Sequence, residues 1–161
     1  MKIPPLDSWW TRRAARRLHD QETFAALNTQ LPEDAVQGFV QSARDLDLRR
    51  SAFAPVDAYL HWSDLANHDF GDRRLQERRA SFDRTLLRLR LFLNANVFRS
   101  RSGVSGETFQ FWPDEDPHSP AIDHDAEVYL HSKVAELELM AENCLAEYAR
   151  FRQAVRRKLL L

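Results

Sequence analysis

The feature that most constrains the fold of this chain is an uninterrupted apolar stripe in its last stretch, residues 125–161. Apolar residues recur there at alternating steps of four and three, which places one residue per turn on a single face of a helix. Neither proline nor glycine interrupts the stripe. It therefore predicts one helix over about 125–158, buried against other helices along its length. Its members are Leu130, Val134, Leu137, Ala141, Cys144, Tyr148, Phe151 and Val155.

A second long helix is predicted over about 72–99, after a turn at Gly71. Its apolar residues form one stripe with a second flank at about 100° to it, so this helix should contact more than one neighbour. Two long helices joined by one connection naturally lie antiparallel. The stripe consists of Leu75, Phe82, Leu86, Leu89 and Leu93, and the flank of Leu87, Leu91 and Phe98.

Shorter helical patterns precede these two, over residues 9–19, 21–28, 32–48 and 55–66. Pro32 and Pro55 stand where the first turn of a helix accepts proline. A chain of 161 residues is long enough for one ordinary domain with one shared core. The sequence therefore predicts an all-α helical bundle in a single domain, 1–161, with two long antiparallel helices and three or four shorter N-terminal helices.

Residues 100–123 break the helical pattern with glycines and prolines, so a long irregular loop is predicted between the two long helices. Its middle, Thr108–Trp112, is aromatic and β-prone, and would form a small hairpin or cap the bundle. The acidic run 114–116 follows. A connection of this length tends to be functional or mobile.

Composition excludes several classes of function. The formal net charge is −1, so no global attraction draws the chain to nucleic acid or to a membrane surface. Cys144 is the single cysteine, which excludes a disulfide within the chain and a cysteine-based zinc site. No apolar run approaches the length of a membrane span, and residues 1–10 lack the apolar core of a signal peptide, so a cytoplasmic location is expected.

Recognisable catalytic motifs are missing as well. The sequence contains no phosphate-binding loop, no dinucleotide-binding glycine motif and no nucleophile elbow. This favours a non-enzymatic role, and no cofactor is predicted.

The main functional signal is the uneven distribution of charge along the two long helices. The last helix is acidic early and basic late, and antiparallel pairing brings its basic end to the arginine-rich start of the other. The predicted binding site is this basic end, composed of Arg73, Arg74, Arg78, Arg79, Arg156, Arg157 and Lys158. The alternative is a set of solvated helix faces with carboxylate partners in the same chain.

Arginines near the N-terminus extend this candidate site: Arg12, Arg13, Arg16 and Arg17. Trp9 and Trp10 precede them and have two interpretations. They would form a stacking platform for nucleic-acid bases, or they would pack down onto the domain as a staple at the helix start.

Histidines provide a second candidate site. His61, His124 and His131 are the candidates for a metal site between facing helices, because His124 and His131 are seven residues apart and share a helix face. The sequence lacks the closely spaced His pair of helical zinc enzymes and any Glu-x-x-His step. The alternative is that these histidines lie at helix interfaces or caps.

These observations favour a non-enzymatic accessory or adaptor subunit that docks onto a larger protein or nucleoprotein assembly. A protein partner or a homo-oligomer is expected, since the long stripe exceeds what short helices cover. The first alternative is sequence-tolerant binding of nucleic acid through the arginine-rich end. The second is a metal-dependent enzyme built on the histidines.

Overall fold

Helices dominate the structure, a computed structural model that describes residues 6–64, 68–99, 108–110 and 124–160. This confirms the predicted all-α helical bundle. In the described residues, the helices are α1 (Leu6–Gln30), α2 (Glu33–Arg44), α3 (Arg50–Ser63), α4 (Arg73–Asn96) and α5 (His124–Leu159), and the short strands are β1 (Leu48–Arg49), β2 (Phe98–Arg99) and β3 (Thr108–Gln110).

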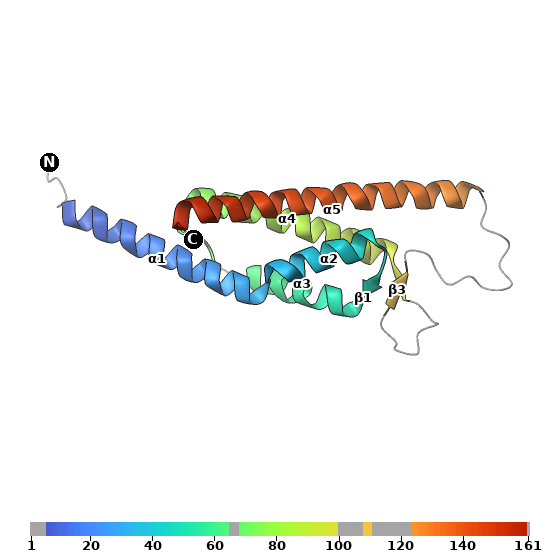
Figure 1. Ribbon diagram of the computed structural model, residues 1–161, viewed down its shortest axis with the longest axis horizontal. Coiled ribbons are helices and arrows are strands. Elements are labelled where there is room, and N and C mark those ends of the chain that lie inside the picture. Colours follow the sequence, from blue (N-terminus) through green and yellow to red (C-terminus); the bar gives the residue numbers. More distant parts are fainter. Residues whose placement is uncertain (1–5, 65–67, 100–107, 111–123, 161) are drawn as a thin grey trace.

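The two long helices α4 and α5 lie side by side and antiparallel, as the sequence predicts (Figure 1). The α5 stripe is buried from Leu137 to Leu159, while Leu130 and Val134 nearer its start are only half-buried. Phe82 of α4 lies at the centre of the pair, with its ring 5.0 Å from that of Tyr148 and 6.4 Å from that of Phe151. Burial of these large side chains is the main stabilising contribution to the pair.

The helix α2 packs on both α3 and α5 and closes the core. Its buried face consists of Val36, Phe39, Val40 and Ala43, as its 3.6-residue period predicts. Arg152 of α5 ties this layer to the long helices, because it lies 3.1 Å from Glu33 and also donates to the side-chain oxygen of Asn28.

The first helix differs from the prediction, because α1 runs through 25 residues without the expected break near Asp20. It is therefore as long as α4 and not one of several short helices. Asp20 is only 2% exposed, and its carboxylate accepts hydrogen bonds from the backbone N–H groups of Gly71 (2.6 Å) and Asp72 (3.2 Å). A polar residue with a partner outside its own helix does not compete with the backbone of that helix, so the helix continues.

The start of α3 also differs from the prediction of a helix over 55–66, because the helix begins at Arg50 and contains Pro55 in its interior. Proline cannot donate to the carbonyl four residues earlier, which is why the sequence alone favoured a start at Pro55. The packing of the first turn overrides this preference. Phe53 is buried, and its ring lies 5.7 Å from that of Phe39 in α2.

Within the predicted connection 100–123, the β-prone segment contributes a strand: residues 108–110 form β3, in the middle of a three-stranded antiparallel sheet. Leu48 pairs with Phe109 on one side, and Phe98 pairs with Gln110 on the other. The end of the predicted 72–99 helix is β2 rather than helix. Residues 100–107 and 111–123, including the acidic run, lie outside the described residues.

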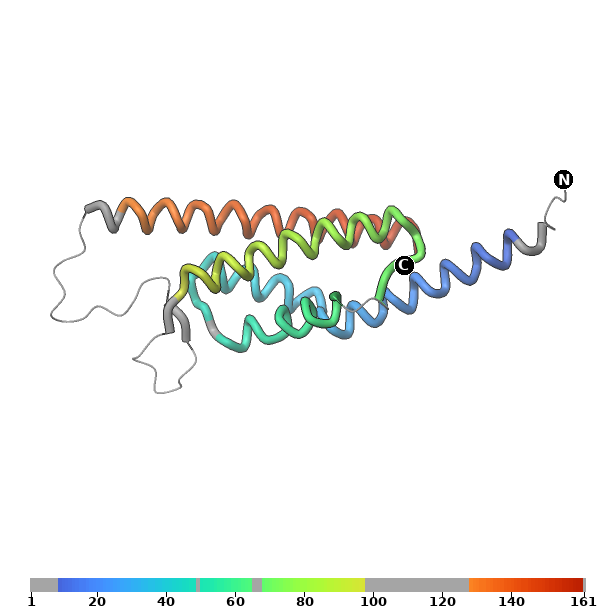
Figure 2. Tube along the Cα trace, turned by 180° about the vertical axis from the view of Figure 1, so that it is seen from behind, coloured from blue at the N-terminus to red at the C-terminus, as the bar shows by residue number. Residues whose placement is uncertain are grey.

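The bundle is elongated, and one helix extends beyond it at each end (Figure 2). The N-terminal half of α1 runs past the C-terminal end of α5, and all of residues 9–19 are exposed; we call them the N-terminal arm. At the opposite end, the first turns of α5 run past the end of α4. In the described part of the chain, every helix is too short or too polar to span a membrane.

Candidate functional site: the basic end of the bundle

The N-terminal arm and the last turn of α5 enclose a cleft of about 420 Å³. The arm supplies most of the wall, and the start of α4 and the end of α5 supply the rest. The lining residues are Trp9, Arg12, Arg13, Arg16, Arg17, Asp20, Asp72, Lys158 and Leu159. Five cationic side chains therefore meet two carboxylates, and the cleft has a positive charge.

Hydrogen bonds to the end of α5 fix the direction of the arm. The guanidinium of Arg17 donates to the backbone carbonyl of Leu159 at 2.9 Å, and the side-chain amide of Gln21 donates to the same oxygen at 3.5 Å. The last carbonyls of a helix have no partners within it and carry partial negative charge, so a cation is favourable there. Arg17 thus has a structural role, while Arg12, Arg13 and Arg16 are exposed.

The two carboxylates that line the cleft, Asp20 and Asp72, both accept hydrogen bonds that stabilise the fold. Asp20 binds the backbone of the turn at residues 71 and 72. Asp72 is the N-cap of α4, accepting from the N–H groups of Arg74 (2.8 Å) and Leu75 (3.2 Å), and it also accepts from Lys158 at 2.9 Å. Partial burial acts to raise the pKa of Asp72, but the bonds from Lys158 and the two N–H groups outweigh it, and the pKa is lowered.

Gly71 allows the arm to approach this turn closely. A Cβ atom at position 71 would lie 2.9 Å from the Cγ atom of Arg16. A larger residue would therefore displace the stem of Arg16, so glycine is favoured here by the close approach of the two segments.

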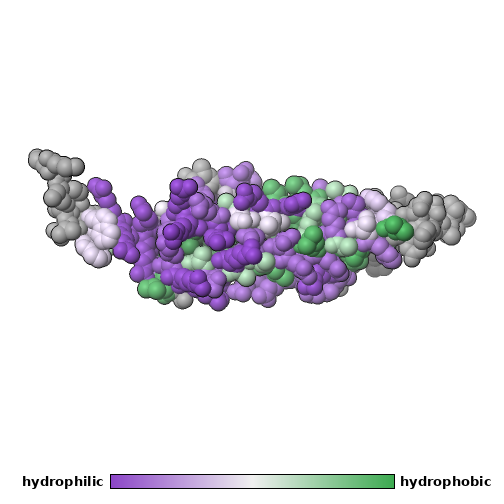
Figure 3. All heavy atoms as spheres, turned by 90° about the horizontal axis from the view of Figure 1, so that it is seen from above, coloured by the Kyte–Doolittle hydropathy of each residue, from purple (hydrophilic) through white to green (hydrophobic). Residues whose placement is uncertain are grey.

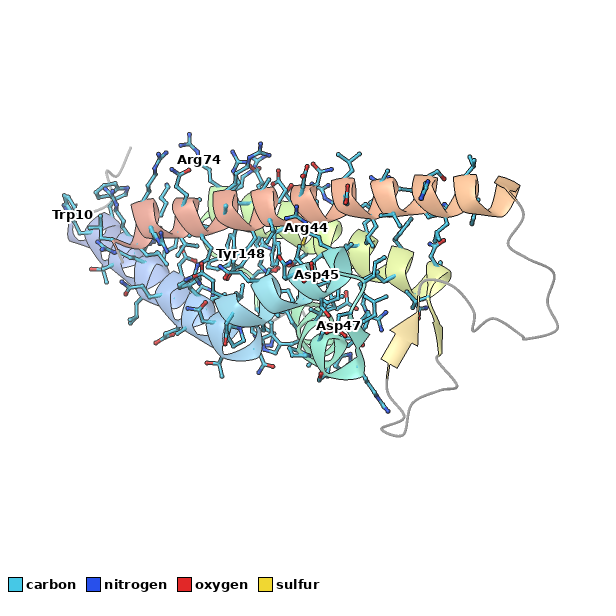
Figure 4. All side chains as sticks on the ribbon, turned by 45° about the vertical axis from the view of Figure 1, so that its right-hand side comes forward. Trp10, Arg44, Asp45, Asp47, Arg74 and Tyr148 are labelled. Carbon is cyan, nitrogen blue, oxygen red and sulfur yellow. The ribbon has the colours of Figure 1, made fainter. Side chains whose placement is uncertain are left out.

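The tryptophans of the arm are exposed, so the interpretation of a packed staple is wrong. Trp9 and Trp10 are 53% and 60% exposed, and their rings lie 4.8 Å apart in an edge-to-face arrangement. The guanidinium of Arg13 lies 5.4 Å from the centre of the Trp9 ring. Figure 4 shows Trp10 at the tip of the arm, away from the bundle. Large exposed aromatic side chains beside arginines are typical of binding surfaces.

Six of the seven predicted basic-end residues lie at this end of the bundle. Arg73, Arg74 and Arg78 are exposed on the first turns of α4, and Arg156, Arg157 and Lys158 are exposed on the last turns of α5. Arg73 pairs with Glu77 at 2.8 Å. Arg74 points away from the bundle (Figure 4). Seen from the side of α5, hydrophilic side chains gather over this end, and hydrophobic ones lie farther along (Figure 3).

Arg79 is the exception, because it is only 1% exposed and cannot contribute to a binding surface. Its guanidinium donates to the carbonyls of Ser63 (3.1 Å) and His68, and its Nε lies 3.3 Å from the carboxylate of Asp83 in an ion pair. Arg79 lies on the same buried stripe of α4 as Leu75 and Phe82, four residues after the first and three before the second. That spacing was visible in the sequence and could have identified Arg79 as an inward-facing residue.

The partners of Arg79 form a buried polar cluster with a structural role. The hydroxyl of Tyr59 donates to Asp83 at 2.6 Å, which links α3 to α4. Burial raises the pKa of Asp83, although the Tyr59 hydrogen bond and the charge of Arg79 oppose the shift. Burial also raises the pKa of Tyr59, and the neighbouring Asp83 adds to this effect. The cluster closes the C-terminal end of α3 through the Ser63 carbonyl.

Two of the three histidine candidates have described side chains, and both are exposed. His61 is exposed on α3, His131 is exposed on α5, and the side chain of His124 lies outside the described ones. No group of three or more potential metal ligands occurs among the described residues. Cys144 is buried on the α5 stripe, and burial raises the pKa of its thiol to about 12, which makes it unreactive at neutral pH.

Comparisons with protein-family models, with curated proteins and with solved structures found no match. The function is therefore inferred from the geometry and charge of the basic end.

Proposed function

We propose that this protein is a non-enzymatic accessory subunit that docks onto a larger protein or nucleoprotein assembly through its basic end. The observation that carries the proposal is the N-terminal arm, which presents exposed tryptophans and arginines beyond the rest of the bundle. The partner surface that fits it is anionic and has apolar sites for the two indole rings.

The arm has little tertiary packing to stabilise it. A helix of about 12 residues is marginal in water without tertiary packing. Residues 9–19 are exposed, and the base of the arm is joined to the bundle by hydrogen bonds from Arg17 and His19, with Asp20 directly after it. Contact with a partner would bury Trp9, Trp10 and Leu18, which are each more than half exposed. Aromatic and arginine side chains contribute the largest energies in protein interfaces.

The chemistry of the cleft supports a docking role over catalysis. A general base needs a carboxylate or imidazole within reach of a substrate and free to accept a proton. Asp20 and Asp72, the carboxylates lining this cleft, already accept hydrogen bonds from backbone N–H groups. The cationic side chains are suited to binding carboxylates or phosphates. The expected cytoplasmic location stays a prediction.

Sequence-tolerant binding of nucleic acid is the second candidate, favoured by the exposure of Trp9 and Trp10 next to Arg12 and Arg13. Bases stack on aromatic rings whatever their sequence, and arginines contact the phosphates. Such binding would weaken steeply with salt, because each neutralised phosphate releases counterions.

The test compares two double variants of equal charge. R12A/R16A removes two exposed arginines of the arm, and the control R44A/R88A removes two exposed arginines from α2 and α4. The full chain and both variants are used as bait in pull-downs, with and without nuclease, and are titrated with single-stranded DNA at several salt concentrations.

Under the proposal, R12A/R16A loses the captured partner and R44A/R88A retains it. Capture that disappears with nuclease identifies nucleic acid as the ligand. In that case the slope of log K against log salt should fall by about two for R12A/R16A, with one unit for each lost phosphate contact. Equal binding by R12A/R16A and the unmodified chain would contradict both candidates.

A further inference from the structure

We propose that copies of this chain associate end to end, with the N-terminal arm of one copy packed on the outer face of the acidic half of α5 in the next copy. The occupant of the basic cleft is then a second copy. The inference rests on the same basic end as the proposed function, and a second copy and an external partner would compete for it.

The acidic half of α5, residues 128–142, presents apolar and acidic side chains together. Val128, Tyr129 and Leu139 are 54%, 55% and 60% exposed. Glu138 and Glu142 are also exposed, and they are four residues apart, so they lie on one side of the helix next to Leu139. Figure 3 shows exposed hydrophobic side chains on the α4–α5 side of the molecule, away from the basic end.

The arm has the complementary character. Trp9 lies among arginines on the face that lines the cleft. Arg12 and Arg16 are four residues apart and share that face, as Glu138 and Glu142 do on α5. Two helices packed along these faces would bring guanidinium groups beside carboxylates, and would cover Trp9 and Leu139 together. Opposite charges aligned in this way give specificity and orientation to an interface.

These complementary surfaces lie toward opposite ends of the elongated bundle, so one chain cannot join them by itself (Figure 1). Each copy therefore has one basic and one acidic surface to offer. Contact between different surfaces is heterologous, and it propagates into a filament unless a rotation between copies closes a ring.

The size of the contact limits its strength. A stable interface buries about 800 Å² on each partner, and the arm comprises only residues 9–19. The association should therefore be weak, dependent on concentration and sensitive to salt. Weak association also leaves the arm available to an external partner.

The experiment measures the mass of the full chain by sedimentation equilibrium over a range of concentrations, at low and high salt. Three variants accompany it. R12E/R16E reverses the charge of the arm, E138R/E142R reverses that of α5, and R44E/R88E is a control that reverses two exposed arginines elsewhere. Circular dichroism verifies that each variant retains the helical content of the unmodified chain.

At low salt, the average mass of the unmodified chain and of R44E/R88E should rise with concentration above the monomer value of 18.8 kDa. It should return toward that value at high salt. R12E/R16E and E138R/E142R should each stay monomeric alone, because both of their surfaces then have the same sign. An equimolar mixture of the two should associate again, because each arm then meets an oppositely charged α5.

A monomeric unmodified chain at every concentration would overturn the inference. An oligomer whose mass does not change with salt or with charge reversal would also overturn it. A mixture of the two variants that stays monomeric would do the same. The proposed function fails separately: E138R/E142R should retain capture of an external partner, whereas R12E/R16E should lose it.

Discussion

Arginine has two different roles in the middle of this bundle and at its basic end. In the middle, Arg79 is 1% exposed and binds two carbonyls and a carboxylate, and Arg90 makes a two-point ion pair with Asp57 at 2.7 and 3.0 Å. At the basic end, Arg12 and Arg16 are exposed beside carboxylates that already bind other groups. The arginines in the middle have their partners within the same chain, whereas Arg12 and Arg16 at the basic end are exposed and accessible to a partner.

The same contrast holds for aromatic residues. Phe82, Tyr148 and Phe151 are buried, and the ring of Phe82 packs near the rings of the other two. Trp9 contacts both Trp10 and Arg13, but the two tryptophans remain more than half exposed. A substitution in the middle should therefore change the stability of the fold, and a substitution in the arm should change binding and leave stability nearly unaltered.

The largest expected effect is that of Arg79→Met. The substitution leaves the carbonyls of Ser63 and His68 without their donor and the Asp83 carboxylate without its cationic partner, so we expect the free energy of unfolding to fall by about 3 kcal/mol or more. Urea unfolding followed by circular dichroism measures it. The control is Arg74→Ala on the exposed side of α4, expected to change it by about 0.5 kcal/mol or less. Similar losses for the two variants would contradict the burial of Arg79.

Asp20→Ala should have the next largest effect. It removes the charged acceptor for the N–H groups of Gly71 and Asp72, and a hydrogen bond to a charged group contributes about 1.5–3 kcal/mol. Glu22→Ala, two residues along on the exposed side of α1, is the matched control. Urea unfolding followed by circular dichroism measures the free energy of unfolding of both variants. A loss for Asp20→Ala no greater than that for Glu22→Ala would show that Asp20 does not support the turn before α4.

Asp72→Ala should cost about 1 kcal/mol, the usual value of a helix N-cap. The effect should depend on pH. Because the pKa of Asp72 is lower in the folded chain, its contribution is complete above the pKa of the unfolded chain, about 3.9. The contribution is lost as pH falls through the lower folded pKa. Unfolding titrations between neutral and acidic pH should therefore show the difference from the unmodified chain shrinking below about pH 4.

Trp10→Ala should have the smallest effect on stability, about 0.5 kcal/mol or less, because the ring is 60% exposed at the tip of the arm. Under the proposed function, the same variant should weaken capture of a partner in pull-downs. A large loss of stability would mean that the arm packs against the bundle and is not available for docking.

Sequence patterns predicted the middle of this molecule better than its ends. The four-and-three spacing from Leu137 to Val155 and the stripe from Leu75 to Leu93 define helices by period alone, and they determine the antiparallel pair. The placement of Lys158 beside Asp72 follows from that pairing. The helical periodicity of a sequence gives no information about partners distant in sequence. The hydrogen bond between Asp20 and Gly71, which lets α1 continue, was therefore not predicted.

The basic end was predicted in outline and corrected in detail. Antiparallel pairing correctly brought the start of α4 and the end of α5 together. Arg79 was placed with its exposed neighbours because charge suggested the surface, although its spacing from Leu75 and Phe82 indicated the core. The cleft between the arm and α5 depends on the bond from Arg17 to the Leu159 carbonyl, a contact across 142 positions that no local pattern encodes.

Amide hydrogen–deuterium exchange of the full chain, alone and with an excess of heparin as a polyanion, tests whether the arm is an unpacked helix that binds anions. We expect slow exchange in the buried part of α1 from Phe24 onward and fast exchange in the arm, residues 9–19. Heparin should slow exchange in the arm and leave α2 and α3 unchanged. An arm that exchanges as slowly as the rest of α1 in the free chain, or one that heparin does not protect, would contradict a docking role for the basic end.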